Sequence, residues 1–479
     1  MFTYSSALRP LARGASLVAV LALLGAASSA AAATVSFRSA PPLSLGGTPG
    51  SLVIDETSNT VYLRNSSLGT FSAIDGEKRV VSGQVGVDNA ASGVAIDPSR
   101  GLAVVTTRSG LVDFVDIGTM TLSGTPLMLG EEPAGVVIDA AAGVAFVATA
   151  KNNAVSVIDL DTRTVLGTPI TVGVNPGPMA LDSRAGVVLV ANRGDATVSA
   201  IDTGSRKVVG KPATVGAQPL GIAIDSARGL AYVTSNAAGS VTVIRVGDVA
   251  PLATFSNVGS NPLGIAIDPD TGRIFVGSYL DSTVTVIDPD TRKPVDVIKT
   301  GLQPISVAFD SRHHVLYTTN ENGGTLSVID EMLSPSLVDA ALPGCSTGER
   351  YSFQLAASGY PHPQFRLGSG ELPAGLTLSP GGLIEGPCGK AGASAFTIVA
   401  GNGASPDATA EFQILVTGSF TTTAPSPTEG TKSVLPPSAN GGELAHTGGH
   451  ELALSLVGIF LGCFGLLCVV LRRAKSFGK

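Results

Sequence analysis

The amino-acid sequence is poor in charged residues and histidine, and it contains no tryptophan. Of its 479 residues 14% are charged, with 30 Lys and Arg against 37 Asp and Glu. This balance excludes a coiled coil, a long-helix protein and the basic surface of a nucleic-acid-binding protein. The lack of tryptophan argues against a carbohydrate site built on aromatic stacking. Glycine (59), proline (30) and β-branched residues are abundant instead, as an all-β chain with many tight turns requires.

Residues 1–33 have the pattern of a cleavable secretory signal. Arg9 and Arg13 precede an apolar run over 17–24, and small residues follow it as far as Ala33. We expect cleavage near Ala32 or Ala33, and therefore a secreted protein. A retained helical anchor is the alternative, but the apolar run is shorter than the roughly 20 residues that a membrane span needs.

A second apolar segment, 452–471, is long enough for a transmembrane helix, and the basic residues after it predict a cytoplasmic tail. A linker rich in Pro, Ser, Thr and Gly covers 419–443. Between linker and helix stands a pentapeptide: Leu444, Ala445, His446, Thr447 and Gly448. The signal carries two positive charges and the segment after Thr447 a net three, so their removal takes the formal charge from −7 to −12.

The order of pentapeptide, apolar span and basic tail resembles the Leu-Ala-x-Thr-Gly variant of the LPXTG sorting signal, found in Gram-positive bacteria of the actinobacterial kind. The resemblance implies that 444–479 is a sorting signal, that a sortase cuts after Thr447, and that Thr447 is joined to peptidoglycan. The chain held in the membrane is then the precursor of a wall-anchored protein. A single-pass membrane anchor is the alternative.

A repeat of 42 or 43 residues runs through 34–337. Each copy has a first apolar strand that ends at an aspartate, then a turn and three more short strands. A proline lies six residues before six of these aspartates, and Ala91 replaces it in the second copy. Four antiparallel strands per period predict a seven-bladed β-propeller. The aspartates are Asp55, Asp97, Asp139, Asp182, Asp225, Asp268 and Asp310.

The seventh copy ends after its third strand, whereas residues 35–45 precede the first copy and read as a fourth strand. We predict that this N-terminal segment completes the last blade, so that the ring closes without an exposed edge. Residues 333–338 are the alternative source of that strand.

The second strands resemble the YVTN family of β-propeller repeats. The resemblance rests on Tyr-Val-Thr-Ser-Asn at 232–236 and Tyr-Thr-Thr-Asn at 317–320, with looser copies at 62–65 and 189–192. It implies a surface-associated propeller, and it transfers no catalytic residue.

After the repeats, residues 338–418 form short alternating strands that fit a β-sandwich. The elements Leu-Pro-x-Gly-Leu-x-Leu at 372–378 and Gly-x-Ile-x-Gly at 382–386 resemble immunoglobulin-like (Ig-like) domains of bacterial surface proteins. Cys345 and Cys388 both fall in this segment, outside the cytosol, which favours a disulfide over two free thiols.

Side chains that could form a catalytic or metal site are scarce. His313 and His314 are expected in a solvated turn, and the other histidines are His362, His446 and His450. The recurrent aspartates are interpreted as turn residues that cap backbone N–H groups. The sequence therefore predicts no catalytic residue, no metal site and no cofactor.

Loops between the second and third strands differ from copy to copy, and they are where we expect a ligand. They form a polar rim suited to hydrogen bonding a sugar or a peptide backbone, although ordinary turn-forming Asn and Gly are the alternative. The rim residues are Asn152, Asn153, Asn192, Arg193, Asp195, Asn236, Tyr279, Asp281, Asn320 and Asn322.

Together these features predict a wall-anchored surface protein that displays a propeller for binding a protein or glycan ligand, with no enzymatic activity. Two alternatives remain: an extracellular propeller enzyme of lactonase, lyase or dehydrogenase type, and a structural coat component.

Overall fold

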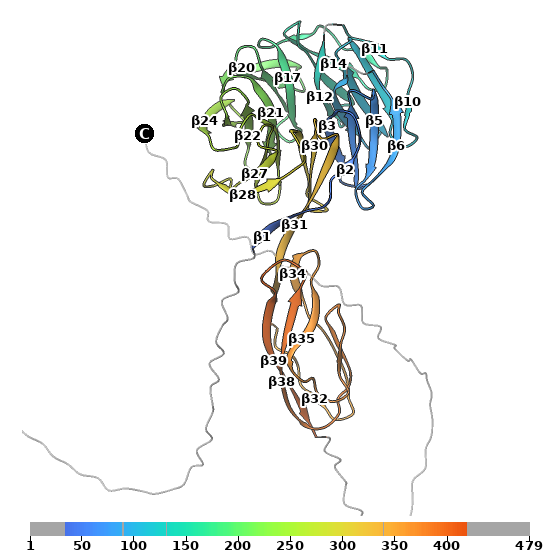
Figure 1. Ribbon diagram of the computed structural model, residues 1–479, viewed down its shortest axis with the longest axis vertical. Coiled ribbons are helices and arrows are strands. Elements are labelled where there is room, and N and C mark those ends of the chain that lie inside the picture. Colours follow the sequence, from blue (N-terminus) through green and yellow to red (C-terminus); the bar gives the residue numbers. More distant parts are fainter. Residues whose placement is uncertain (1–33, 89–90, 131, 339, 419–479) are drawn as a thin grey trace, which may run out of the picture. The chain divides into compact units, whose positions relative to one another are not determined.

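The structure is a computed structural model, and it describes residues 34–88, 91–130, 132–338 and 340–418. All regular secondary structure in these ranges is β-strand. Seven antiparallel sheets form a ring of blades, and a smaller sandwich follows them in the chain (Figure 1). The predicted all-β fold, a seven-bladed propeller followed by an Ig-like sandwich, is confirmed. The predicted transmembrane helix lies outside the described residues.

The first six blades follow one another along the chain, and the first strand of each lies on the inside of the ring. Blades 2 and 3 end in two short outer strands. The strands of blades 1 to 3 are β3 (Pro49–Asp55), β4 (Thr60–Asn65), β5 (Thr70–Asp75), β6 (Val80–Gly86), β7 (Ala91–Asp97), β8 (Leu102–Thr107), β9 (Leu111–Asp116), β10 (Thr121–Leu122), β11 (Leu127–Met128), β12 (Pro133–Asp139), β13 (Val144–Thr149), β14 (Ala154–Asp159), β15 (Thr164–Val165) and β16 (Ile170–Thr171). Those of blades 4 to 6 are β17 (Pro176–Asp182), β18 (Val187–Asn192), β19 (Thr197–Asp202), β20 (Lys207–Thr214), β21 (Pro219–Asp225), β22 (Leu230–Ser235), β23 (Ser240–Arg245), β24 (Ala250–Phe255), β25 (Pro262–Ile267), β26 (Ile274–Ser278), β27 (Thr283–Ile287) and β28 (Pro294–Lys299).

The seventh blade joins the two ends of the propeller. Its strands are β29 (Pro304–Asp310), β30 (Val315–Asn320) and β31 (Thr325–Leu337), and β1 (Val35–Ser39) pairs antiparallel with β31 as the outer strand. The short β2 (Leu43–Ser44) pairs with the start of β31. The predicted closure by the N-terminal segment is therefore confirmed. Residues 333–337, the alternative, instead continue β31 towards the Ig-like module.

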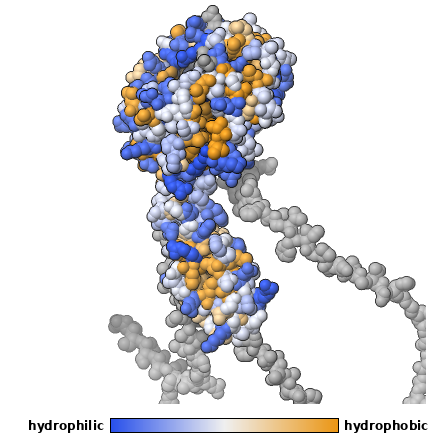
Figure 2. Space-filling model, turned by 45° about the vertical axis from the view of Figure 1, so that its right-hand side comes forward, coloured by the Kyte–Doolittle hydropathy of each residue, from blue (hydrophilic) through white to orange (hydrophobic). Residues whose placement is uncertain are grey.

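The hydrophobic core of the ring lies between blades. Seven clusters of buried side chains each combine residues from two neighbouring blades, and together they fill all seven interfaces. A middle strand is therefore covered on both faces, as in β13, where all six residues are buried. Outer strands are covered less, and Val295 and Val297 of β28 are exposed. Figure 2 shows such hydrophobic side chains at the surface.

Turn aspartates hold the hairpins together, as predicted. All seven recurrent aspartates at the ends of the first strands accept a backbone N–H from two or three residues further on. At the end of the third strand, Asp159 accepts the N–H of Thr162 at 2.7 Å, and these hydrogen bonds lower the pKa of the Asp159 carboxyl. The aspartates are thus structural turn caps.

Glycines allow neighbouring first strands to approach closely. A Cβ on Gly221 of β21 would lie 2.2 Å from the carbonyl oxygen of Leu263 in the next blade. That same oxygen accepts a hydrogen bond from Thr234 Oγ1 at 2.6 Å. In the four blades with glycine at the third position of the first strand, this position is closed to side chains because the next blade occupies the space.

We expect Gly221→Ala to lower the free energy of unfolding by about 1–3 kcal/mol, because the added methyl must push two blades apart. The matched control is Gly86→Ala, also in a strand, where a Cβ would meet nothing within 4 Å. Urea unfolding of the purified protein measures both. Equal midpoints for the two variants would show that the contact between blades is not tight.

The Ig-like module has two sheets. One is β32 (Cys345–Ser346), β39 (Ala408–Thr417), β38 (Gly392–Gly401) and β35 (Gln364–Gly370), and the other is β33 (Arg350–Gln354), β37 (Leu383–Pro387) and β36 (Thr377–Leu378). Cys345 and Cys388 form the predicted disulfide and belong to the buried core of the module. The strand β34 (Ala357–Tyr360) leaves this sandwich and pairs with β31.

The two histidines of the last blade contact the Ig-like module. The ring of His314 lies 4.4 Å from that of Tyr360, whose hydroxyl donates a hydrogen bond to the carbonyl of His313. His313 Nδ1 is 2.9 Å from Asp310, and His314 Nδ1 is 3.0 Å from Glu331. The two histidines lie in a turn, as expected, but the turn is only partly open to solvent because Tyr360, distant in sequence, covers part of it.

Candidate functional site

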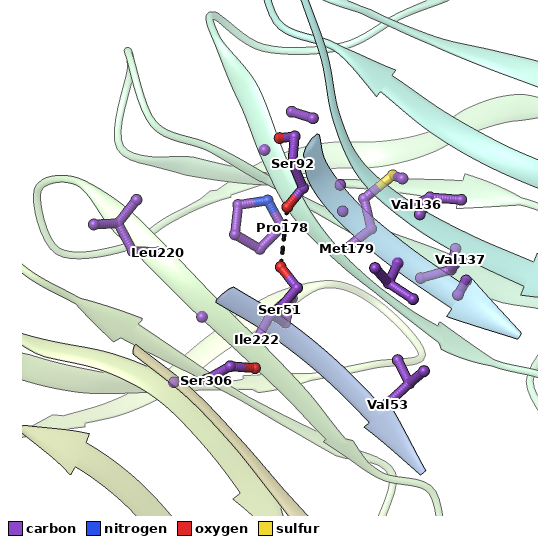
Figure 3. Close-up of a pocket in the computed structure, with 18 of the residues that line it drawn as sticks. Ser51, Val53, Ser92, Val136, Val137, Pro178, Met179, Leu220, Ile222 and Ser306 are labelled. Atoms are coloured by element: carbon purple, nitrogen blue, oxygen red, sulfur yellow. Dashed lines mark hydrogen bonds between the residues drawn. The ribbon is translucent and has the colours of Figure 1, made fainter. Parts of the chain in front are cut away.

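The first strands of all seven blades enclose a channel, a cavity of about 890 Å³. Figure 3 shows its wall: Val53, Val137 and Ile222 among the aliphatic side chains, and the hydroxyl groups of Ser51, Ser92 and Ser306. Each first strand is hydrogen-bonded to a neighbouring strand on one side only, so its other edge turns backbone N–H and C=O groups towards the channel. The wall therefore offers both apolar surface and hydrogen-bonding groups.

The charged residues of the cavity gather at one end, which we call the mouth. The mouth is the edge of the ring where the first strands begin and the loops between second and third strands lie. Its charged lining residues are Arg64, Arg108, Glu132 and Arg193, and Asn175 lies beside them; all the other lining residues are uncharged. The charged side chains of the cavity lining are thus confined to the mouth.

Arg64 is held in place by contacts between blades 1 and 2. Its Nε donates to the carbonyl of Ser92 at 3.0 Å and its Nη1 to Ser66 Oγ at 3.0 Å. The guanidinium covers Gly50, where a Cβ would lie 2.4 Å from Cζ. Burial lowers the pKa of Arg64 to about 10, and the positive charge of Arg108 adds to this effect. Arg64 is therefore a preorganised cation in a site that already holds another.

Arg64 occupies a position that three other blades fill with threonine, namely Thr106, Thr234 and Thr319. Thr234 Oγ1 donates to the carbonyl of Leu263, and Thr319 Oγ1 donates to that of Gly50 at 2.7 Å. These carbonyls belong to the second residue of the next first strand, as does the Ser92 carbonyl that Arg64 contacts. Arg64 therefore links two blades as the threonines do, and it also adds a positive charge.

Arg193 repeats this arrangement in blade 4. Its guanidinium lies over Gly177, with Nε 2.9 Å from the position of a Cβ, and Nη2 donates to Asn175 Oδ1 at 3.1 Å. Burial lowers the pKa of Arg193, and Arg108 contributes again. The Nε of Arg193 is buried and has no hydrogen-bond partner within the described part of the chain.

The other rim residues have different environments. The buried side chains of Asn192 and Asn320 donate to hydroxyl groups of their own blades, at 2.9 and 3.0 Å, so these amides stabilise the blade. Asp195 and Asp281 accept the N–H groups of Val174 and Ser260 in the loops that lead to the first strands.

The remaining predicted residues lie in the loops around the mouth. Asn153 Oδ1 accepts the N–H of Asn175 at 2.9 Å, whereas Asn152 and Asn322 are exposed and Asn236 is half-buried. Tyr279 donates its hydroxyl proton to Glu321 at 3.0 Å; burial and this hydrogen bond raise the pKa of Tyr279. Of the ten predicted residues, the structure places Arg193 in the cavity lining.

Arg64, Arg108 and Glu132 were missed by the sequence analysis. A signal for two of them was present, because Arg108 follows the last residue of β8 as Arg193 follows that of β18, and Arg64 replaces a recurrent threonine. Glu132 precedes β12 and makes an ion pair with Lys151 at 3.3 Å.

The described residues contain no group of three or more His, Cys, Asp or Glu side chains placed to hold a metal ion. Among them there is likewise no helix with the length and hydrophobicity needed to cross a membrane. Residues 444–448, predicted as the sorting pentapeptide, lie outside the described ranges.

Comparison with known proteins identifies parts of the fold. Residues 334–417 match the family described as "Putative Ig domain". A chain of the Kuenenia stuttgartiensis hydrazine synthase is similar in structure, with a TM-score of 0.53 and 20% identity over 59% of this chain and 95% of that one. The Cps50 (Swd1) β-propeller domain of Myceliophteria thermophila has a TM-score of 0.53 and 8% identity over 62% of this chain and 99% of that one. At these identities the likeness shows the fold alone.

A search of curated proteins gives no match. The combination of modules suggests an extracellular or surface protein. By structure and by family match, the chain is a seven-bladed β-propeller followed by an Ig-like domain.

Proposed function

We propose that this protein is a secreted, cell-wall-anchored surface protein whose propeller binds a protein or glycan ligand at the mouth of its channel. One observation carries the proposal. The strand β31 begins next to a loop of the mouth, at Thr325, and leaves the blade at the opposite edge, beyond Asp330, before it pairs with β34 of the Ig-like module. The chain therefore continues towards the predicted linker and sorting signal from the edge that does not carry the mouth.

Anchoring at the C-terminal end would leave the mouth turned away from the point of attachment. The mouth has polar loops and fixed cations, and the channel behind it has hydroxyl and backbone groups that can form hydrogen bonds, which together suit binding. The secretory signal, the linker and the Leu-Ala-x-Thr-Gly pentapeptide support display outside the cell.

The test of anchoring is Thr447→Ala. We expect the variant to be lost almost completely from the peptidoglycan fraction and to appear in the membrane fraction, because the sortase would no longer recognise the motif and cleave after residue 447. Immunoblots of wall, membrane and medium fractions measure this, and Thr431→Ala in the linker is the control. If the purified wall fraction contains as much Thr447→Ala variant as wild-type protein, the proposal is wrong.

The test of binding uses the purified full chain in mild detergent. It is applied to arrays of immobilised glycans, wall polymers and matrix proteins. We expect at least one saturable interaction, and no interaction with any array would count against a binding function.

A further inference from the structure

The lining of the cavity at the mouth has an excess of positive charge in a protein that is acidic as a whole. The formal net charge of the chain is −7, yet Arg64, Arg108 and Arg193 line one cavity. Glu132, which also pairs with Lys151, and Glu321, which accepts a hydrogen bond from Tyr279, offset part of this charge, but three arginines remain against one carboxylate in the lining. Arg108 lies close enough to both Arg64 and Arg193 to lower their pKa values, so an anion bound among these cations would relieve their mutual repulsion.

Two of the three guanidiniums are built into the fold. Arg64 and Arg193 each lie over a glycine, Gly50 and Gly177, that directly follows the proline at the start of a first strand. A side chain at Gly50 would occupy the place of the Arg64 guanidinium, and one at Gly177 that of Arg193. The absence of side chains at these glycines thus makes room for one cation in blade 1 and another in blade 4.

These cations retain unused hydrogen-bonding capacity. Within the described residues, Arg193 Nε is buried without a partner, and Arg64 Nη2 and the whole Arg108 side chain make no hydrogen bond. Guanidinium N–H groups in a rigid fork match the oxygens of a carboxylate or a phosphate. The unused donors therefore point to an oxyanion as the bound group.

The channel behind the mouth indicates what carries the oxyanion. Its wall has no charged side chain, and it combines the hydroxyl groups of Ser51, Ser92 and Ser306 with backbone groups of the first strands and aliphatic surface. A volume of about 890 Å³ lies within the range of small-molecule sites. A sugar ring matches such a wall, because its hydroxyl groups can form hydrogen bonds and its C–H groups can pack on the aliphatic side chains.

We propose that the mouth binds an anionic sugar unit, with Arg64, Arg108 and Arg193 around its carboxylate or phosphate group and the sugar ring in the channel. The inference rests on the proposed binding function, and it narrows the ligand to glycans or monosaccharides that carry one oxyanion per recognised unit.

The experiment titrates the purified full chain with glucuronate, glucose 6-phosphate and glucose by isothermal titration calorimetry. We expect one of the two anionic sugars to bind with a stoichiometry of one, and glucose to bind at least about tenfold more weakly, since it lacks the charge-assisted hydrogen bonds. Comparison of the two anions distinguishes a carboxylate ligand from a phosphate ligand.

Each variant introduces the residue that another blade of this propeller has at the equivalent position. Arg193→Asn reproduces Asn236 of blade 5, Arg108→Ala reproduces Ala150 of blade 3, and Arg64→Thr reproduces Thr234, which keeps the hydrogen bond between blades. We expect Arg193→Asn to weaken binding about tenfold or more, and the triple variant to abolish it. The control Arg206→Asn removes an equal charge from blade 4, in an exposed turn at the opposite edge.

Several results would overturn the inference. Equal affinity for glucose and the anionic sugars would do so, as would an equal loss of affinity in Arg206→Asn and Arg193→Asn. If none of the three sugars binds but a ligand on the arrays does, the anionic-sugar site is wrong and the binding function stands. If neither experiment detects binding, both fail.

Discussion

Replacing Cys345 and Cys388 together by alanine lowers the free energy of unfolding of the Ig-like module by about 3–4 kcal/mol. The disulfide closes a loop with a sequence separation of 43, which removes conformational freedom from the unfolded chain. It is also buried in a core that depends on few large side chains, since Tyr351, Phe365, Phe396 and Phe412 supply the aromatic part of it.

Differential scanning calorimetry of the full chain measures this effect as a lower transition temperature for the module. The single variant Cys345→Ala should behave like the double variant, because either change removes the bond, and wild-type protein in excess reductant should approach both. An unchanged transition in the double variant would show that the disulfide contributes nothing to stability.

Ser36→Pro is expected to lower the stability of the propeller by about 3 kcal/mol. The N–H of Ala40 donates to Val328, and that of Ser334 donates to Thr34, so the even-numbered residues of β1 carry the hydrogen bonds to β31. Proline at 36 removes one of these donors and displaces the strand. Phe37, which packs edge-on against Phe275 at 5.8 Å, would then lose its place between the last two blades.

Ser39→Pro is the matched control for Ser36→Pro. Both serines are exposed and both lie in β1, but the N–H of Ser39 points away from β31 by the same alternation. We expect its urea midpoint to stay near that of the wild type. If the two proline variants unfold at the same midpoint, the strand does not close the ring through these hydrogen bonds.

The architecture of the ring was predictable because every blade solves the same packing problem. A blade covered on both faces needs an apolar first strand, an aspartate to cap the turn and a fully buried middle strand. The same residue pattern therefore appears in every copy of the repeat. The repeated aspartates, from Asp55 to Asp310, record it directly. The closure by β1 was predictable for a related reason, since the seventh copy lacked a strand that the N-terminus had in excess.

The candidate site was less accessible to sequence reasoning because the environment of its residues depends on side-chain contacts, within a blade for some and between blades for others, that leave no pattern in the sequence. Asn192 and Asn320 are polar loop residues in the sequence, but the hydroxyl groups of their own third strands bury and bind them. Arg64 lies inside a strand, and its place in the mouth depends on Ser92 of the next blade. Comparison of equivalent positions between copies would have identified Arg64 and Arg108 as departures from the repeat.

His314 shows the same limit at the junction of the modules. Its turn is ordinary in sequence, and only the pairing of β31 with β34 brings Tyr360 against it. Contacts between modules leave no periodic pattern, so composition and spacing do not reveal them.

The pairing of β1 with β31 also sets the order in which the protein can mature. Thr34 donates its N–H to Ser334 Oγ, 300 residues later in the chain. At roughly 5–20 residues per second of synthesis, the first strand waits about 15–60 seconds for its partner. The last interface can form only when the final blade has been made. A chain that ends before β31 would therefore leave β1 without its partner strand and the ring open.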